Sequence, residues 1–201
     1  MLLILTGDVQ IGKTRWLQRS VAQLEDAGVP CHGVIAPGTW IDNGDGTFEK
    51  TGIDNLLLPT HEVVPFARRA DLAQQDGQFD EQSQAGRAKL KWHISDSAIA
   101  RVNEHFRTLA AATSASEPKK GVLFVDELGQ LELLRGEGLT DAMDMLSKGP
   151  QSRYAHAIVV ARDLFGLPER AAELFANAWG GSERISPTDE AWQTWLAPLT
   201  H

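Results

Sequence analysis

Short apolar runs alternate along the chain with longer stretches in which apolar residues recur every three or four positions. Four runs lack polar alternation and predict strands that are buried on both faces, at residues 2–6, 31–36, 122–126 and 155–161. Helical spacing predicts helices at residues 13–27, 96–112, about 139–147 and about 168–180, and a capped helix start at 186–189. This alternation is typical of an α/β protein with a mostly parallel sheet.

Two segments interrupt this alternation. The turn sequence Asn43-Gly44-Asp45-Gly46 lies between β-type residues and predicts a β-hairpin, because Asn and Gly tolerate the positive φ of a tight turn. We therefore expect a β insertion at about residues 38–60. Residues 71–87 are polar and rich in glutamine, with no clear periodicity, and predict a mobile loop.

Length and charge narrow the class of protein. The 201 residues suit a single domain, residues 1–201, with room for one small insertion. With 27 acidic and 19 basic residues the net charge is −8, which argues against nonspecific binding to nucleic acid or to an anionic membrane. The single cysteine, Cys31, excludes an internal disulfide, and the short apolar N-terminal run resembles a strand more than a signal peptide. We expect a cytoplasmic protein.

The candidate chemistry begins directly after the first predicted strand. The sequence there fits G-x-x-x-x-G-K-T, the Walker A pattern of a phosphate-binding loop (P-loop), with residues Gly7, Asp8, Val9, Gln10, Ile11, Gly12, Lys13 and Thr14. Such a loop binds phosphate through backbone N–H groups and the start of a helix. Lys13 would reach the β- and γ-phosphates of a nucleotide, and the Thr14 hydroxyl would bind Mg²⁺. The alternative is a turn that only starts a helix, with Lys13 as a surface charge. If the position of Gln10 requires positive φ, the glutamine destabilises the folded loop by on the order of 1 kcal/mol relative to glycine.

Two acids follow the apolar run at 122–125, in the manner of a Walker B strand. Asp126 would lie at the carboxyl edge of the sheet beside the phosphate loop, where it could hold Mg²⁺. Glu127 points elsewhere and is the candidate general base that activates water. The alternative is a strand that ends in two solvated acids.

These residues resemble a known family. The loop at 7–14, the stretch Asp126-Glu127-Leu128-Gly129-Gln130-Leu131-Glu132-Leu133 and the order of parts are similar to the small P-loop nucleoside-triphosphatases first described from thermophiles. The segment from Gly33 through the hairpin to Arg68 is similar to that family's inserted segment, and residues 159–162 match its late strand ending in arginine. The resemblance implies a three-layer α/β fold with a mostly parallel RecA-like sheet, a β-hairpin insertion and broad hydrolysis of nucleoside triphosphates. Gln10 and Arg15 depart from the family, which usually has glycine and a small hydroxyl residue there.

Other candidates are weaker. Arg162 follows the predicted strand at 155–161, so it would emerge at the same edge and could stabilise transition-state charge, or it could pair with Asp163. Arg68 and Arg69 could contact phosphate or lie in a solvated loop. Trp40 and Trp92 could stack on a base, although packing is the commoner role of tryptophan.

Three functions are compatible with these residues. The first is Mg²⁺-dependent hydrolysis of nucleoside triphosphates such as ATP and GTP to diphosphate and phosphate, with Glu127, Lys13 and Arg162 as catalytic residues. The second is a small-molecule or nucleotide kinase with residues 71–87 as a lid, although this segment is poor in the arginines that such a lid needs. The third is a nucleotide-dependent switch or adaptor, although no guanine-reading motif is present. The expected partner is a nucleoside triphosphate, with no nucleic acid and no membrane.

Overall fold

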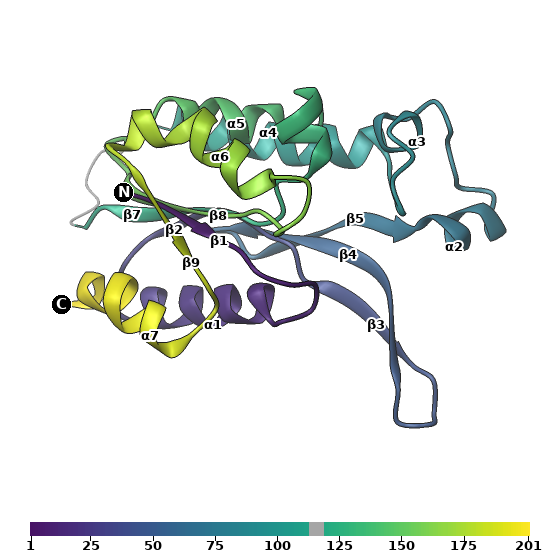
Figure 1. Cartoon of the computed structure of the whole chain (residues 1–201), viewed down its shortest axis with the longest axis horizontal. Coiled ribbons are helices and arrows are strands. Elements are labelled where there is room, and N and C mark those ends of the chain that lie inside the picture. Colours follow the sequence, from purple (N-terminus) through teal and green to yellow (C-terminus); the bar gives the residue numbers. More distant parts are fainter. Residues whose placement is uncertain (113–118) are drawn as a thin grey trace.

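A nine-stranded mixed sheet lies between two layers of helices in the computed structural model, which describes residues 1–112 and 119–201 (Figure 1). The strands are β1 (Leu2–Leu5), β2 (Cys31–Ile35), β3 (Gly38–Asp42), β4 (Phe48–Leu58), β5 (Glu62–Arg69), β6 (Trp92–Ile94), β7 (Gly121–Val125), β8 (Tyr154–Val160) and β9 (Ser182–Ile185). The helices are α1 (Lys13–Asp26), α2 (Ala70–Gln75), α3 (Gln84–Arg87), α4 (Asp96–Ala111), α5 (Thr140–Ser147), α6 (Leu167–Phe175) and α7 (Asp189–Ala191). The described residues also form the helical turns η1 (Leu131–Arg135), η2 (Ala176–Trp179), η3 (Trp192–Leu196) and η4 (Ala197–Thr200).

The centre of the sheet is parallel and buried on both faces. Strands β2, β7, β8, β1 and β9 lie side by side in this order, each parallel to the next. Along β1, Leu2 and Ile4 pack under α4, α5 and α6, whereas Leu3 and Leu5 pack against α1 and the C-terminal turns. This explains why β1 reads as an unbroken apolar run, and it confirms the predicted mostly parallel α/β sheet with helices on both faces.

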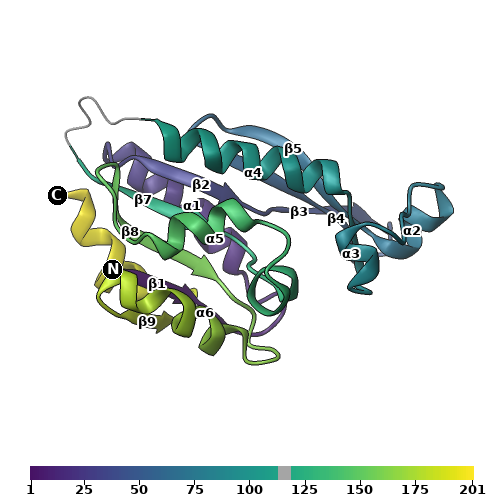
Figure 2. The same ribbon diagram turned by 90° about the horizontal axis from the view of Figure 1, so that it is seen from above.

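The antiparallel strands form an extension at one side of this sheet. Strand β4 pairs antiparallel with β2, β3 and β5, and β5 pairs antiparallel with β6. The two views of Figures 1 and 2 show the extension projecting past the carboxyl ends of the parallel strands. The predicted hairpin is present, since Asn43 N–H donates to the Thr47 carbonyl at 3.0 Å between β3 and β4. The extension is larger than predicted, because it continues through β5 to β6.

Most predicted elements are confirmed, and the exceptions have physical reasons. Strands β5, β6 and β9 are absent from the sequence prediction because they are short or partly exposed, and β5 contains Pro65. The expectation of an irregular loop at 71–87 is wrong where α2 and α3 form. These helices are anchored by the small buried residues Ala73 and Ala85, which carry too little apolar surface to produce a readable pattern. Mobility of this segment stays a prediction.

The C-terminal helix start is confirmed. The Thr188 hydroxyl accepts a hydrogen bond from Ala191 N–H at 3.1 Å, as an N-cap does. The Trp16 indole N–H donates to the Thr188 carbonyl at 3.0 Å and so joins this turn to α1. No helix within the described residues is long and apolar enough to cross a membrane.

Candidate active site

The phosphate loop connects β1 to α1 at the carboxyl edge of the parallel sheet. Three of its residues adopt positive φ, at Gly7 (132°), Gln10 (65°) and Gly12 (99°). Gly12 occupies the N-cap position of α1, so the free N–H groups of the 14-residue helix start directly at the loop. The sequence prediction of strand, loop and helix is confirmed in its geometry.

The Lys13 side chain folds back over the loop. Its ammonium group donates to the carbonyls of Gly7 and Asp8, both at 2.7 Å. Burial lowers the pKa of Lys13, and the charge of Arg162 lowers it further. Lys13 is therefore a half-buried cation at the mouth of the loop rather than a free surface charge.

Asp126 follows β7 and lies next to the loop. It is 2% exposed, and its Oδ2 accepts a hydrogen bond from Ala36 N–H at 3.0 Å, from the end of the neighbouring strand β2. Burial raises the pKa of this carboxyl to about 6. The N–H of Ala36 and the Thr14 hydroxyl both favour the charged form. Oδ1 is buried and has no hydrogen-bond partner among the described residues.

This donor set fits a divalent cation. The unpartnered Oδ1 of Asp126 and the hydroxyl of Thr14 are hard oxygen donors at the end of a phosphate loop. Magnesium is commonly held by one or two protein oxygens together with substrate phosphates. The described part of the chain contains no cluster of three or more His, Cys, Asp or Glu side chains that could hold a metal ion without such phosphates.

Glu127 and Arg162 meet across the ends of neighbouring strands. Glu127 follows Asp126 with a φ of 66°, and Arg162 lies two residues beyond the end of β8. The Arg162 guanidinium donates to Glu127 Oε1 in a direct ion pair. The sequence alternative that pairs Arg162 with Asp163 is therefore wrong. Arg162 also acts electrostatically on Lys13, while its own pKa is lowered by burial and raised by the charge of Asp126.

Glu132 holds the loop that follows these acids. Its side chain is 7% exposed and accepts hydrogen bonds from Gly129 N–H at 2.9 Å and from Leu139 N–H at 3.1 Å. A Cβ atom at Gly138 would lie 2.0 Å from Glu132 Oε1, so the carboxylate needs glycine there. The Asp-Glu-x-Gly-x-x-Glu stretch thus contains two acids at the site and one that fixes the loop behind them.

The extension adds a cation that sequence reasoning missed. Lys50 on β4 acts electrostatically on both Asp126 and Arg162, so it belongs to the same cluster of charges. No local signal distinguishes this lysine, because only the register of β3 and β4 brings it to the site. The weaker candidates do not join the cluster: Arg68 pairs with Asp76, and Arg69 pairs with Glu49 and Asp71.

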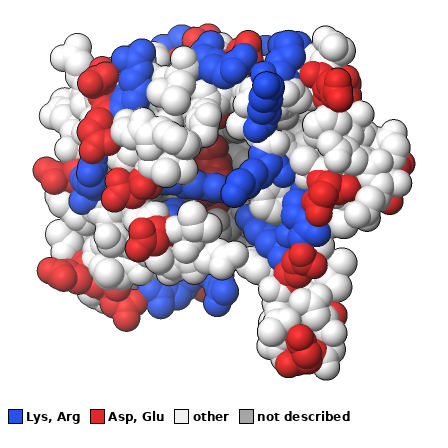
Figure 3. Space-filling model, turned by 45° about the vertical axis from the view of Figure 1, so that its right-hand side comes forward, with Lys and Arg blue, Asp and Glu red and all other residues white. Residues whose placement is uncertain are grey.

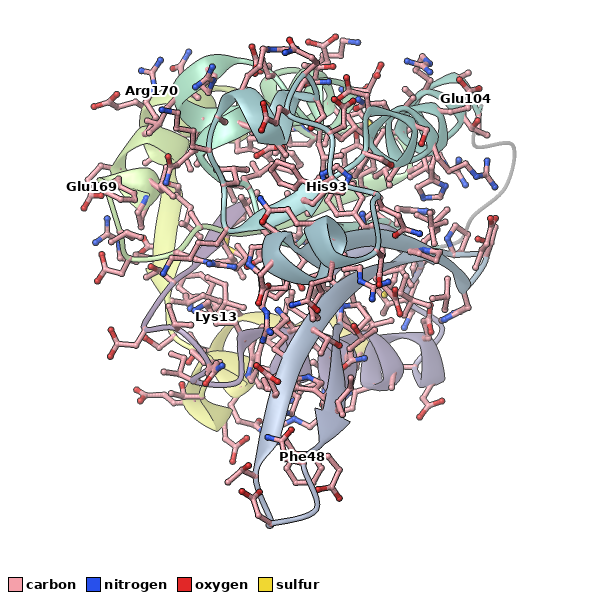
Figure 4. All side chains as sticks on the ribbon, turned by 90° about the vertical axis from the view of Figure 1, so that its right-hand side faces the viewer. Lys13, Phe48, His93, Glu104, Glu169 and Arg170 are labelled. Carbon is pink, nitrogen blue, oxygen red and sulfur yellow. The ribbon has the colours of Figure 1, made fainter. Side chains whose placement is uncertain are left out.

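Basic side chains gather on the face of the molecule that contains Lys13. Figure 3 shows Lys and Arg side chains gathered around a hollow between the body and the extension. Figure 4 looks onto the same edge, with Lys13 in the body and Phe48 at the end of the projecting hairpin. Of the two tryptophans considered for base stacking, Trp40 is exposed on β3 and Trp92 lies under the Lys50 ammonium group.

Comparison with solved structures identifies the fold. The chain is similar to a human cancer-related nucleoside triphosphatase, with a TM-score of 0.61 and 19% identity over 98% of this chain and 93% of that one. It is also similar to THEP1 from the hyperthermophile Aquifex aeolicus, with a TM-score of 0.58 and 17% identity over 98% of this chain and 96% of that one. No family model matches the sequence. No curated protein matches it either. At this identity the likeness establishes a shared α/β P-loop fold, in agreement with the fold that the sequence resemblance implies.

Proposed function

We propose that this chain hydrolyses nucleoside triphosphates to nucleoside diphosphate and phosphate, with magnesium as the cofactor. The observation that carries the proposal is the meeting of Lys13, Asp126 and the Glu127–Arg162 pair at one edge of the sheet. These groups come from three separate segments of the chain. The name of the human protein of similar fold supports the same activity.

Each residue has a distinct task in this reaction. The loop N–H groups and Lys13 bind the phosphates, and Thr14 and Asp126 would hold magnesium, which neutralises phosphate charge when bound. Glu127 accepts a proton from water as the water oxygen bonds to the γ-phosphorus, and the bond from that phosphorus to the leaving diphosphate breaks. Arg162 stabilises the charge on the transferred group. Since Arg162 is paired with Glu127, the arginine must turn to the phosphate before Glu127 is free to act as a base.

Phosphate release tests this function directly. We expect phosphate from ATP and GTP with magnesium and without any acceptor, and much less with a chelator. Glu127→Gln should leave nucleotide binding close to wild type and lower turnover by about 10²- to 10⁴-fold. Glu183→Gln, on the exposed edge strand β9, is the matched control.

The alternatives give different results in the same assay. If ATP is consumed only after a nucleoside, sugar or other acceptor is added, the protein is a kinase rather than a hydrolase. Tight binding with very slow turnover would favour a switch.

A further inference from the structure

The extension contains a lysine, Lys50, that acts on charges of the phosphate site and has no role in the proposed hydrolysis. Lys50 lies on β4, and its aliphatic chain runs over Gly38 at the start of β3. A Cβ atom at Gly38 would lie 2.6 Å from Lys50 Cε, so a larger residue there would shift the end of the lysine side chain. The ammonium group lies 5.2 Å from the centre of the Trp92 ring, at a distance typical of a cation–π contact. The side chain is therefore supported along its length.

This path lies near the segment that contacts Asp126. Gly38 is two residues beyond Ala36, whose N–H donates to Asp126 Oδ2 at 3.0 Å. Lys50 thus passes over the segment that begins two residues after the backbone N–H in contact with the buried carboxylate. The charges of Lys50 and Lys13 both lower the pKa of Asp126.

The position of Lys50 differs from that of Lys13. The charges of Arg162 and Asp126 act on both lysines, and Asp8, at the start of the loop, acts on Lys13 in addition. Lys13 therefore lies at the loop, and Lys50 lies farther from the start of the loop. Of the two, Lys50 is placed toward the end of a bound polyphosphate that is farther from the loop.

Lys50 lacks a carboxylate partner of its own. Among residues 1–112 and 119–201, no ion pair to its ammonium group is present, and burial together with the charge of Arg162 lowers its pKa. Lys13, Lys50 and Arg162 face three acids, Asp8, Asp126 and Glu127, of which Glu127 is paired with Arg162. Because Lys50 has no such ion pair, its ammonium group is available to bind an anion from solution.

We propose that Lys50 binds the terminal phosphate of the nucleotide and makes the site select nucleoside triphosphates over diphosphates. The inference rests on the proposed function, since it concerns the same nucleotide. It gives the β extension a direct part in the site. A diphosphate held by the loop and Lys13 would leave Lys50 without its ligand.

The test compares the affinities of two nucleotides by calorimetric titration. The probes are ADP and an ATP analogue with an imido bridge between the β- and γ-phosphorus atoms, each with magnesium. Lys50→Gln should weaken the triphosphate analogue roughly 10- to 100-fold, as loss of one charge-assisted hydrogen bond does, and change ADP affinity by less than about twofold. Lys50→Arg, which keeps the charge, should recover part of the loss. The control Lys91→Gln, at an exposed lysine of the same extension, should change neither affinity.

The possible results decide whether Lys50 binds the terminal phosphate. Equal weakening of both nucleotides would reject selection of the terminal phosphate, and unchanged affinities would reject any contact with Lys50. Thermal unfolding of Lys50→Gln, expected close to wild type because no ion pair is lost, separates binding from folding. If wild type binds neither nucleotide, the proposed function itself fails. If wild type hydrolyses ATP and Lys50→Gln binds both nucleotides as wild type does, only this inference fails.

Discussion

Arg162 and Glu127 form an ion pair that joins the ends of the neighbouring strands β8 and β7. Both side chains are partly buried, and the same guanidinium acts on Lys13. The candidate base is thus neutralised by the candidate transition-state cation. Substrate phosphate offers Arg162 a second anion, and this competition couples nucleotide binding to release of Glu127.

Loss of Arg162 should therefore affect turnover far more than binding. We expect Arg162→Ala to lower turnover by roughly 10³-fold or more, the range known for arginines that stabilise phosphoryl transfer. Single-turnover phosphate release measures this. Combined with Glu127→Gln, the loss should be much smaller than the product of the two single losses, because residues in direct contact act as a unit. Arg184→Ala, which removes an exposed ion pair with Glu169, is the control. Independent, multiplying losses would contradict the coupling.

Lys13 should control affinity as well as rate. Among the described residues its ammonium group donates to loop carbonyls and forms no ion pair, so Lys13→Ala removes a phosphate ligand without breaking an ion pair. Loss of a charge-assisted hydrogen bond of roughly 1.5 to 3 kcal/mol should weaken ATP binding by about 10- to 100-fold. Equilibrium titration measures this, with the exposed Lys148→Ala as control. Retained affinity in Lys13→Ala would contradict the assignment of the loop.

Local signals account for what the sequence predicts well. Strand β1 and the loop that follows it are encoded in adjacent residues, so an apolar run followed by G-x-x-x-x-G-K-T is enough to place them. Asp126 and Arg162 could be placed at the carboxyl edge because each follows a buried strand. Their closeness to each other could not be predicted, because the order of β7 and β8 in the sheet is set by packing of the whole chain.

The position of Lys50 at the site could not be predicted from the residues around it in the sequence. Lys50 reaches the site through the register of β3 on β4, which includes a bulge between Thr39 and Trp40. The turn at residues 43–46 predicts the hairpin, but no local signal predicts the bulge that shifts this register. The helices α2 and α3 were missed for a related reason, since alanines that fit closely against neighbours carry little periodic apolar signal.

Gln10 should store backbone strain in the loop. Its φ of 65° lies in the left-handed region, which costs a side chain other than glycine roughly 1 kcal/mol. Gln10→Gly should therefore raise the free energy of unfolding by about 0.5 to 1 kcal/mol, measured by urea denaturation. The same exchange at Gln18, exposed in the middle of α1, should lower it by about as much, because glycine weakens a helix. A loss of stability in Gln10→Gly would show that the glutamine makes favourable contacts that outweigh its conformation.

Asp126 should make the stability of the metal-free protein fall as pH rises. Burial raises its pKa from 3.8 to about 6, so the folded state binds this proton more tightly than the unfolded state does. The stabilisation from protonation is fully present below about pH 4 and is lost as pH rises from about 4 to about 6. Asp126→Asn removes the buried charge and keeps an oxygen to accept from Ala36 N–H.

The Asp126→Asn variant should therefore be more stable than wild type at pH 7.5, by an amount on the order of 2 kcal/mol. The difference should shrink at pH 5. Urea denaturation with a chelator and without nucleotide measures both values. Asp144→Asn, on an exposed position of α5, makes the same chemical change in water and serves as the control. An Asp126→Asn protein that is less stable than wild type at pH 7.5 would contradict the assignment, because it would mean that the charged carboxylate is stabilised by its neighbours rather than penalised by burial.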